Sequence, residues 1–250
     1  MQRAERLNVI LERVGVEGRV DVGGLADRLG VSGATVRRDL QALSRNQLLV
    51  RTHGGAVSQR ADAEVPARIK AVLAQPEKRR IARAADALVG DGAVVGLTGG
   101  STTLELARVL LGRRGLTVVT NSLDVASELA GRAGIHLVVI GGIVRRSREL
   151  VGPAAETMLA NYHLDLAVIG VDGLSSAGCT TYDEMEATTD AAFLQQARRR
   201  VVVADSSKIG RVTFARISPL SGITDLVTDR GAPAEALEPI RQAGVAVVTV

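Results

Sequence analysis

A short turn of small residues, Gly99 to Thr103, has the composition of an anion-binding loop. Gly99 and Gly100 lack a Cβ, so the backbone can approach a ligand closely there. Ser101, Thr102 and Thr103 then supply hydroxyl and amide groups where a helix is expected to begin, and the helix dipole favours an anion at that end. The turn predicts a phosphate-binding site, although a plain strand-to-helix connection uses the same residue types.

Polar residues also follow the neighbouring apolar runs. They are Thr120, Asn121 and Ser122; Gly141 and Gly142 with Arg145; Asp172 with Gly173; and Lys208. Each has a simpler interpretation: Asn121 caps a helix, Asp172 shapes a turn, and the arginines at 145, 146 and 148 form a solvated loop. Because ligands bind outside the carboxyl ends of strands in open α/β sheets, we expect these groups to gather at one edge. Hydroxyls, a lysine and a helix N-terminus suit a phosphorylated polyol.

The same groups leave a second hypothesis open, an enzyme of the sugar-phosphate isomerase or deaminase type. Asp172, Lys208 and either Glu184 or Glu186 would then supply the acid–base groups. The only cysteine is Cys179, which excludes an intramolecular disulfide and argues against a cysteine-based zinc site. We expect neither a metal nor a cofactor.

A different constellation lies near the N-terminus, where the pattern predicts a helix, a tight turn at Gly30-Val31 and another helix. Ser32 is a good N-cap residue for the second helix, and Val36, Leu40 and Leu43 form one apolar stripe along it. At about 100° per residue, the opposite face carries small and cationic residues. They are Ala34, Thr35, Arg37, Arg38, Gln41 and Arg45.

Such a face suits recognition of duplex DNA, because small residues permit close approach to base edges and arginine binds guanine or phosphate. Arg51 and His53 follow on a hairpin around Gly54-Gly55, where contact with phosphate or the minor groove is expected. The alternative is that Arg37 and Arg38 only solvate a helix. The turn, the cap and the hairpin lie in register, which favours a winged helix-turn-helix.

Two domains are expected from the periodicity. Residues 1–58 form the small helical domain, residues 59–75 a linker or connecting helix, and residues 76–250 a larger domain. In the larger domain seven short apolar runs, beginning at residue 93, alternate with helical stretches at 102–111, 123–131, 184–198 and 234–243. Near-continuous apolar runs are typical of strands buried on both faces, so we predict an α/β domain with a mostly parallel sheet.

The charge distribution agrees with a polyanionic partner for the first domain. Residues 1–58 hold nine arginines and six acidic residues, whereas residues 59–250 hold 22 basic and 21 acidic residues. Residues 1–58 contain no Phe, Tyr or Trp, the side chains on which single-stranded nucleic acids stack, so duplex DNA is favoured. No apolar stretch reaches the roughly 20 residues that a membrane span needs, and we expect a cytoplasmic location.

The segment GVSGATVRRDLQAL at 30–43, followed by VRTHGGAV at 50–57, resembles the DNA-binding signature of the DeoR family of transcriptional regulators. The resemblance continues through LTGGSTT, VVTNSLDVASEL, VIGG, GVDGL with GCTT, and VVVADSSKIG, in order, into the sensing domain of that family. That domain is similar to sugar-phosphate isomerases. The resemblance implies a repressor of a carbohydrate-metabolism operon, relieved by a phosphorylated sugar and assembled as a homodimer or homotetramer.

The resemblance also assigns roles to individual residues. It implies that Ser32, Thr35, Arg37 and Arg38 face the operator. In the sensing domain, Gly100, Ser101, Thr102 and Thr103 would hold the phosphate, and Asp172 and Lys208 would meet the sugar end. The chain departs from the family at Thr98, where an aspartate is usual. The loss of this carboxylate either alters the recognition of the effector's hydroxyl groups or lowers the penalty for binding a more anionic effector.

Overall fold

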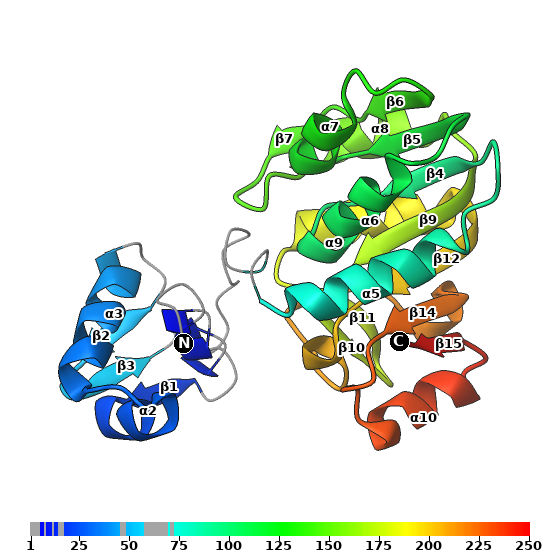
Figure 1. Cartoon of the computed structure of the whole chain (residues 1–250). Coiled ribbons are helices and arrows are strands. Elements are labelled where there is room, and N and C mark those ends of the chain that lie inside the picture. The colour runs from blue at the N-terminus through cyan, green and yellow to red at the C-terminus, as the bar shows by residue number, and fades with distance from the viewer. Residues whose placement is uncertain are drawn as a thin grey trace. The chain divides into compact units, whose positions relative to one another are not determined.

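The chain forms two compact units, Met1–Leu73 and Ala74–Val250, in the computed structural model (Figure 1). The structure describes residues 6–7, 9–11, 13–14, 18–45, 49–57, 70 and 73–250. Most of the expected connecting segment at 59–75 lies outside these residues.

In the described part of the first unit, helices α2 (Val22–Leu29) and α3 (Gly33–Arg45) pack against a small antiparallel sheet, and residues 6–7, 9–11 and 13–14 are also helical. The strands of this sheet are β1 (Arg19–Asp21), β2 (Val50–Thr52) and β3 (Gly55–Val57), which are ordered β1-β3-β2. Ile10, Val36, Leu40 and Leu49 are buried at its centre. The predicted hairpin is confirmed, and β1 is an additional strand whose three residues gave no periodic signal.

The turn between α2 and α3 follows from three local preferences. Gly30 ends α2 in the left-handed conformation, at φ 62°, which glycine adopts without steric cost. Asp21 caps α2 by accepting from the Gly24 N–H at 2.8 Å, and Ser32 Oγ accepts from the Thr35 N–H at 3.2 Å at the start of α3. These caps fix where both helices begin, as the sequence predicts for Ser32.

The second unit is built on a seven-stranded sheet in which every pair of neighbours is parallel. Its order is β15-β14-β12-β9-β4-β5-β6, and the strands are β4 (Val94–Leu97), β5 (Leu116–Thr120), β6 (Ile135–Val139), β9 (Leu164–Gly170), β12 (Ala197–Val203), β14 (Asp225–Thr228) and β15 (Ala246–Thr249). The prediction of a mostly parallel α/β domain is confirmed.

Helices cover both faces of this sheet (Figure 1). One face packs against α5 (Gln75–Asp86), α6 (Ser101–Leu110) and α7 (Leu123–Leu129). The other packs against α8 (Pro153–Leu159), α9 (Glu184–Gln195) and α10 (Ala234–Gln242). Strand residues such as Val95 and Val168 are fully buried between the layers, which explains why the strands are apolar throughout.

The direction of the chain reverses at the centre of the sheet. From β4 it proceeds through β5 to β6 on one side, and β9, β12, β14 and β15 fill the other side. The crevice outside the carboxyl ends of β4 and β9 is therefore a topological switch point, the usual place for a ligand in such a sheet. None of the helices that the described residues form has the length and apolar character needed to cross a bilayer.

One predicted helix is too long. The stretch at 184–198 ends as helix α9 at Gln195, and β12 begins at Ala197. Polar residues follow Ala197 at the start of β12, so the sequence shows no apolar run there. The Arg199 guanidinium pairs with both oxygens of Asp225, at 2.7 and 2.9 Å, and Arg198 pairs with Asp165. Cross-strand ion pairs thus take the place of the apolar residues that mark the other strands.

Several short elements were not predicted. They are α8, the hairpin of β7 (Ile143–Val144) and β8 (Leu150–Val151), the antiparallel sheet of β10 (Gly173–Ser175), β11 (Gly178–Thr181) and β13 (Ala215–Ser218), and the short 3-10 helices η1 (Ser206–Lys208) and η2 (Leu220–Gly222). Two to seven residues are too few to establish a hydrophobic period.

Candidate functional site

The exposed face of α3 carries the predicted DNA-contacting residues. Six of them are exposed, Ser32, Ala34, Arg37, Arg38, Gln41 and Arg45, and Thr35 is half-buried. Within the described part of the chain, no carboxylate pairs with Arg37, Arg38 or Arg45. The guanidinium groups are therefore available to an external anion.

A buried aspartate on the core-facing side of α3 anchors this helix through an ion pair. Asp39 is only 2% exposed, and its Oδ2 accepts a hydrogen bond from Arg6 Nε at 2.6 Å. Leu40 and Leu43 pack beside it in the core. Sequence reasoning missed Asp39, because an aspartate among apolar residues gives no sign of a partner 33 positions away.

The wing depends on two glycines. Gly54 has φ 90°, and a Cβ at Gly55 would lie 2.0 Å from the carbonyl oxygen of Val20. The Gly54 carbonyl accepts from the Val22 N–H at 2.8 Å and so joins the wing to α2. Arg51 and His53 are both exposed on this hairpin.

The glycine turn after β4 lies at the switch point of the second unit. Thr98, which is buried, accepts a hydrogen bond from the Gly170 N–H at 3.3 Å and donates to the Gly99 carbonyl at 3.4 Å. Its hydroxyl ties the carboxyl ends of β4 and β9 together. A Cβ at Gly99 would lie 2.3 Å from the Glu149 side chain, so only glycine fits.

The first turn of α6 follows directly. Gly100 precedes it at φ 121°, and no side chain caps the helix. Thr103 Oγ1 donates back to the Gly100 carbonyl at 2.9 Å. Thr102 and Thr103 are buried and Ser101 is half-buried, and the Thr103 hydroxyl is already engaged by the Gly100 carbonyl.

The loop after β5 is held by its own polar groups. Thr120 Oγ1 donates to the Leu97 carbonyl at 2.7 Å and accepts from the Ser122 N–H at 3.1 Å. Ser122, rather than Asn121, caps α7 through the Val125 N–H. Asn121 is fully buried; its Nδ2 donates to Glu149 Oε2 at 3.4 Å, and its Oδ1 has no partner among the described groups.

Acidic side chains gather beside these loops. Asp172 lies 3.4 Å from Lys208 Nζ. Thr181 Oγ1 lies 3.3 Å from Asp172 and 3.4 Å from Glu186, and its single hydrogen can be donated to one or shared between the two. Ser147 donates to Glu186 at 2.5 Å. The pair of Asp172 and Lys208, predicted from separate loops, is thus brought together.

Asp190 lies buried at the same place. Burial raises its pKa well above the usual range, and the nearby Glu149, Glu186 and Asp172 add to this effect. Oδ1 of Asp190 has no hydrogen-bond partner among the described residues. Desolvation and repulsion both disfavour its charged form. Sequence reasoning missed Asp190 and Glu149, and considered Glu186 only as an enzymatic acid or base.

Three predicted residues have a structural explanation. A Cβ at Gly142 would lie 2.8 Å from the Val151 carbonyl oxygen, and one at Gly173 would lie 2.6 Å from that of Arg211. Both glycines therefore permit close backbone packing. Arg145 pairs with Asp183 and lies 3.8 Å from Glu186, which joins the β7–β8 hairpin to α9.

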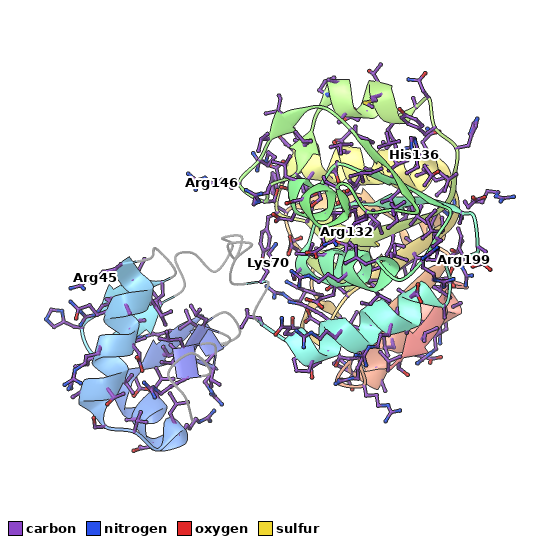
Figure 2. All side chains as sticks on the ribbon, turned by 45° about the horizontal axis from the view of Figure 1, so that its top comes forward. Arg45, Lys70, Arg132, His136, Arg146 and Arg199 are labelled. Atoms are coloured by element: carbon purple, nitrogen blue, oxygen red, sulfur yellow. The ribbon has the colours of Figure 1, made fainter. Side chains whose placement is uncertain are left out.

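The expectation of a solvated arginine loop holds for one residue. Arg146 is exposed and extends away from the unit (Figure 2). Arg148, in contrast, donates to Asp124 at 2.6 Å. The described residues contain no group of three His, Cys, Asp or Glu arranged to hold a metal ion.

Two family models match the chain. The DeoR-like helix-turn-helix domain matches residues 6–61, and the DeoR C-terminal sensor domain matches residues 73–230. The chain belongs to the DeoR family of transcriptional regulators. Both models are those of regulators and neither is that of an enzyme, so the isomerase or deaminase alternative is not supported.

Whole-length relatives agree with membership of the DeoR family. The HTH-type transcriptional regulator GlpR of Haloferax volcanii is 37% identical, and the match covers 99% of this chain and 98% of the relative. The glycerol-3-phosphate regulon repressor of Escherichia coli K12 is 30% identical over 95% of each chain. Ribose 5-phosphate isomerase A of Methanocaldococcus jannaschii is 23% identical, with a TM-score of 0.41 over 54% of each chain.

Proposed function

We propose that this DeoR-family regulator represses a carbohydrate-metabolism operon and that a phosphorylated sugar relieves the repression. The arginines on the exposed face of α3 carry the proposal: no described carboxylate pairs with them, and Val36, Leu40 and Leu43 bury the opposite face of the helix and so direct the arginines outward. The DNA-contacting set is Ser32, Ala34, Thr35, Arg37, Arg38, Gln41, Arg45, Arg51 and His53. The first turn of α3 enters the major groove, and the wing contacts the backbone.

The effector is proposed to bind at the carboxyl edge of the sheet. The amides of Ser101, Thr102 and Thr103 take its phosphate, because the start of α6 has no side-chain cap and favours an anion. Asp172 and Lys208, 3.4 Å apart, bind the hydroxyls at the other end. The Escherichia coli relative is a glycerol-3-phosphate regulon repressor, and its name supports a phosphorylated polyol as the effector.

The remaining members of the proposed site shape the loops around it. The loop beside the phosphate is shaped by Thr120, Asn121 and Ser122. Gly99 allows the glycine turn to lie close to the Glu149 side chain. Gly142, Gly173 and Arg145 border the site through the backbone packing and ion pairs described above, and Gly141, which is exposed, precedes Gly142 on the loop after β6. We also propose a homodimer or homotetramer in the cytoplasm, which would place two recognition helices on paired half-sites.

The effector must distinguish two states of the protein in order to act. A ligand shifts an equilibrium only by its differential affinity, so relief of repression requires tighter effector binding to the DNA-free state. By linkage, operator DNA must weaken effector binding by the same factor.

The test is fluorescence anisotropy with labelled duplex from the regulator's own promoter, titrated with a panel of sugar phosphates. We expect one of them to release the wild-type protein. Lys208→Ala should keep operator affinity and lose the response. Arg198→Ala is the matched control, because it removes a cation from the other end of β12, the strand that leads into the Lys208 loop.

Two outcomes contradict the proposal. A normal response of Lys208→Ala removes this lysine from the effector site. The absence of operator release by every phosphorylated sugar at millimolar concentration, in a protein that binds the duplex, refutes the class of effector.

A further inference from the structure

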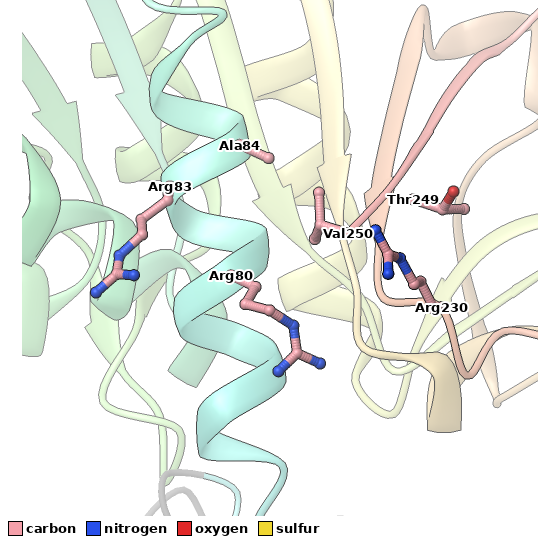
Figure 3. A pocket seen from close by; sticks show the side chains of 6 residues that line it. All are labelled: Arg80, Arg83, Ala84, Arg230, Thr249 and Val250. Atoms are coloured by element: carbon pink, nitrogen blue, oxygen red, sulfur yellow. The ribbon is translucent and has the colours of Figure 1, made fainter.

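Three arginines line a cleft on the second unit, Ala74–Val250, the sensor unit. No residue of the glycine turn lines this cleft. The cleft, of about 670 Å³, opens between α5, the loop after β14 and the end of β15 (Figure 3). It is lined by Arg80, Arg83, Ala84, Arg230, Thr249 and Val250. Arg80 and Arg230 extend into it from opposite sides (Figure 3). The proposed effector residues do not line it.

Few acidic side chains oppose the three arginines of the cleft. Arg83 and Arg230 are exposed, and no carboxylate side chain among the described residues pairs with either. Among the described residues Arg80 pairs with Glu77 alone, at 3.3 Å, and both side chains are open to solvent, where such a pair contributes little. The acid next to Arg230, Asp229, is buried and accepts from the N–H groups of Ser206 and Gly231, at 2.6 and 2.9 Å.

Both walls are anchored, so the arginines project from fixed backbone. Lys78, two residues before Arg80 on α5, is buried and lies 3.8 Å from Asp205. On the other wall, the Arg230 N–H donates to the Val250 carbonyl oxygen at 3.0 Å. A preorganised site loses less entropy when it binds a ligand.

We infer that this cleft binds the phosphate group of a small ligand, either inorganic phosphate or a phosphate monoester. Guanidinium groups match the geometry of phosphate oxygens and bind them through paired, charge-assisted hydrogen bonds. The volume lies within the range of small-molecule sites. Ala84 and Val250 add a small apolar surface for the rest of a monoester. This site is independent of the effector site proposed above.

The test measures how inorganic phosphate raises the Tm of the full-length protein, with ionic strength held constant by sodium chloride. For Arg80→Ala/Arg230→Ala we expect an apparent Kd for phosphate at least about tenfold weaker than in the wild type. Arg79→Ala is the matched control: Arg79 is also exposed on α5, but it pairs with Glu105 at 3.5 Å and does not line the cleft. The control should bind phosphate as the wild type does.

A second variant separates this cleft from the effector site. Ser101→Glu places a carboxylate at the start of α6, where the effector site is proposed to hold its phosphate, and should retain the phosphate-dependent rise in Tm if the cleft is the binding site. Loss of that rise in Ser101→Glu, or its persistence in Arg80→Ala/Arg230→Ala, overturns the inference. If Arg79→Ala loses as much phosphate affinity as Arg80→Ala/Arg230→Ala, the effect is one of nonspecific charge and the inference is overturned. The inference is also overturned if Arg80→Ala/Arg230→Ala loses operator affinity but keeps its phosphate affinity.

Discussion

The recognition face of α3 and the carboxyl edge of the sensor sheet both collect polar residues, but in opposite surroundings. On α3 the cations are exposed and no described carboxylate pairs with Arg37 or Arg38. At the carboxyl edge Asn121, Asp172 and Asp190 are buried in a network of hydrogen bonds and carboxylates. We therefore expect substitutions on the exposed face of α3 to leave stability nearly unchanged, whereas substitutions at the carboxyl edge should change stability as well as any ligand binding there.

The strongest test of this contrast is Arg37→Ala/Arg38→Ala. Each arginine that binds a base or phosphate is worth about 1–3 kcal/mol, so operator affinity should fall about 100-fold or more. Stability should change by less than about 0.5 kcal/mol, since both side chains are exposed. Fluorescence anisotropy and thermal melting measure the two effects, and exposed Arg132→Ala in the sensor unit is the control. Full operator affinity in the double variant would remove α3 as the recognition helix.

At the carboxyl edge, Gly99→Ala should destabilise the sensor unit by about 1–3 kcal/mol, the usual cost of overpacking. The new Cβ would lie 2.3 Å from the Glu149 side chain, which is buried and has little room to move. Tyrosine fluorescence during urea unfolding reports on this unit alone, because both tyrosines, Tyr162 and Tyr182, lie in it.

Gly141→Ala is the control for Gly99→Ala. Nothing lies within 4 Å of a Cβ at Gly141, so its stability should match that of the wild type. Equal stability of the two variants would show that the glycine turn does not need close packing.

Thr98→Val tests the hydrogen bond by which the Thr98 hydroxyl joins the carboxyl ends of β4 and β9. It leaves the Gly170 N–H without its acceptor, which should cost about 1–2 kcal/mol. Thr213→Val is the matched comparison, because Thr213 Oγ1 is buried without a hydrogen-bond partner among the described residues. We expect that variant to be neutral or slightly stabilised in urea unfolding. A neutral Thr98→Val contradicts the structural role of this hydroxyl.

The smallest effect is expected from Asp190→Asn, and it depends on pH. The pKa of Asp190 is raised in the folded protein, so its unfavourable charging costs stability as pH rises above the unfolded value of about 3.9. The variant should melt about 2–4 °C higher than the wild type at pH 8, a shift that corresponds to about 1 kcal/mol.

At pH 4 the gain from Asp190→Asn should be much smaller, because the wild-type carboxyl is then protonated in the folded state and about half protonated in the unfolded state. Asp225→Asn gives the opposite control: Arg199 holds the pKa of Asp225 below its usual value, so its removal destabilises at neutral pH. A lower Tm for Asp190→Asn at pH 8 contradicts the proposed cost of charging.

The two regions also differ in how far the sequence predicted them. Every α3 residue predicted to face outward is exposed or half-buried, since a single helix with a clear apolar stripe fixes both faces. At the carboxyl edge the loops were predicted, but the roles of Thr120 and Thr103 as backbone ties were not. Whether a hydroxyl faces a ligand or a carbonyl depends on neighbours that are distant in sequence.

The sequence by itself determined the winged helix-turn-helix, the parallel sheet and the loops that follow its strands, because periodicity, caps and glycine turns act over a few residues. Only the tertiary structure decided that Glu149 and Asp190 join Asp172 and that Thr98 ties β4 to β9. It also decided that Arg80 and Arg230 share a cleft. Strand order and burial create those contacts, and neither is encoded in the spacing of residues along one segment.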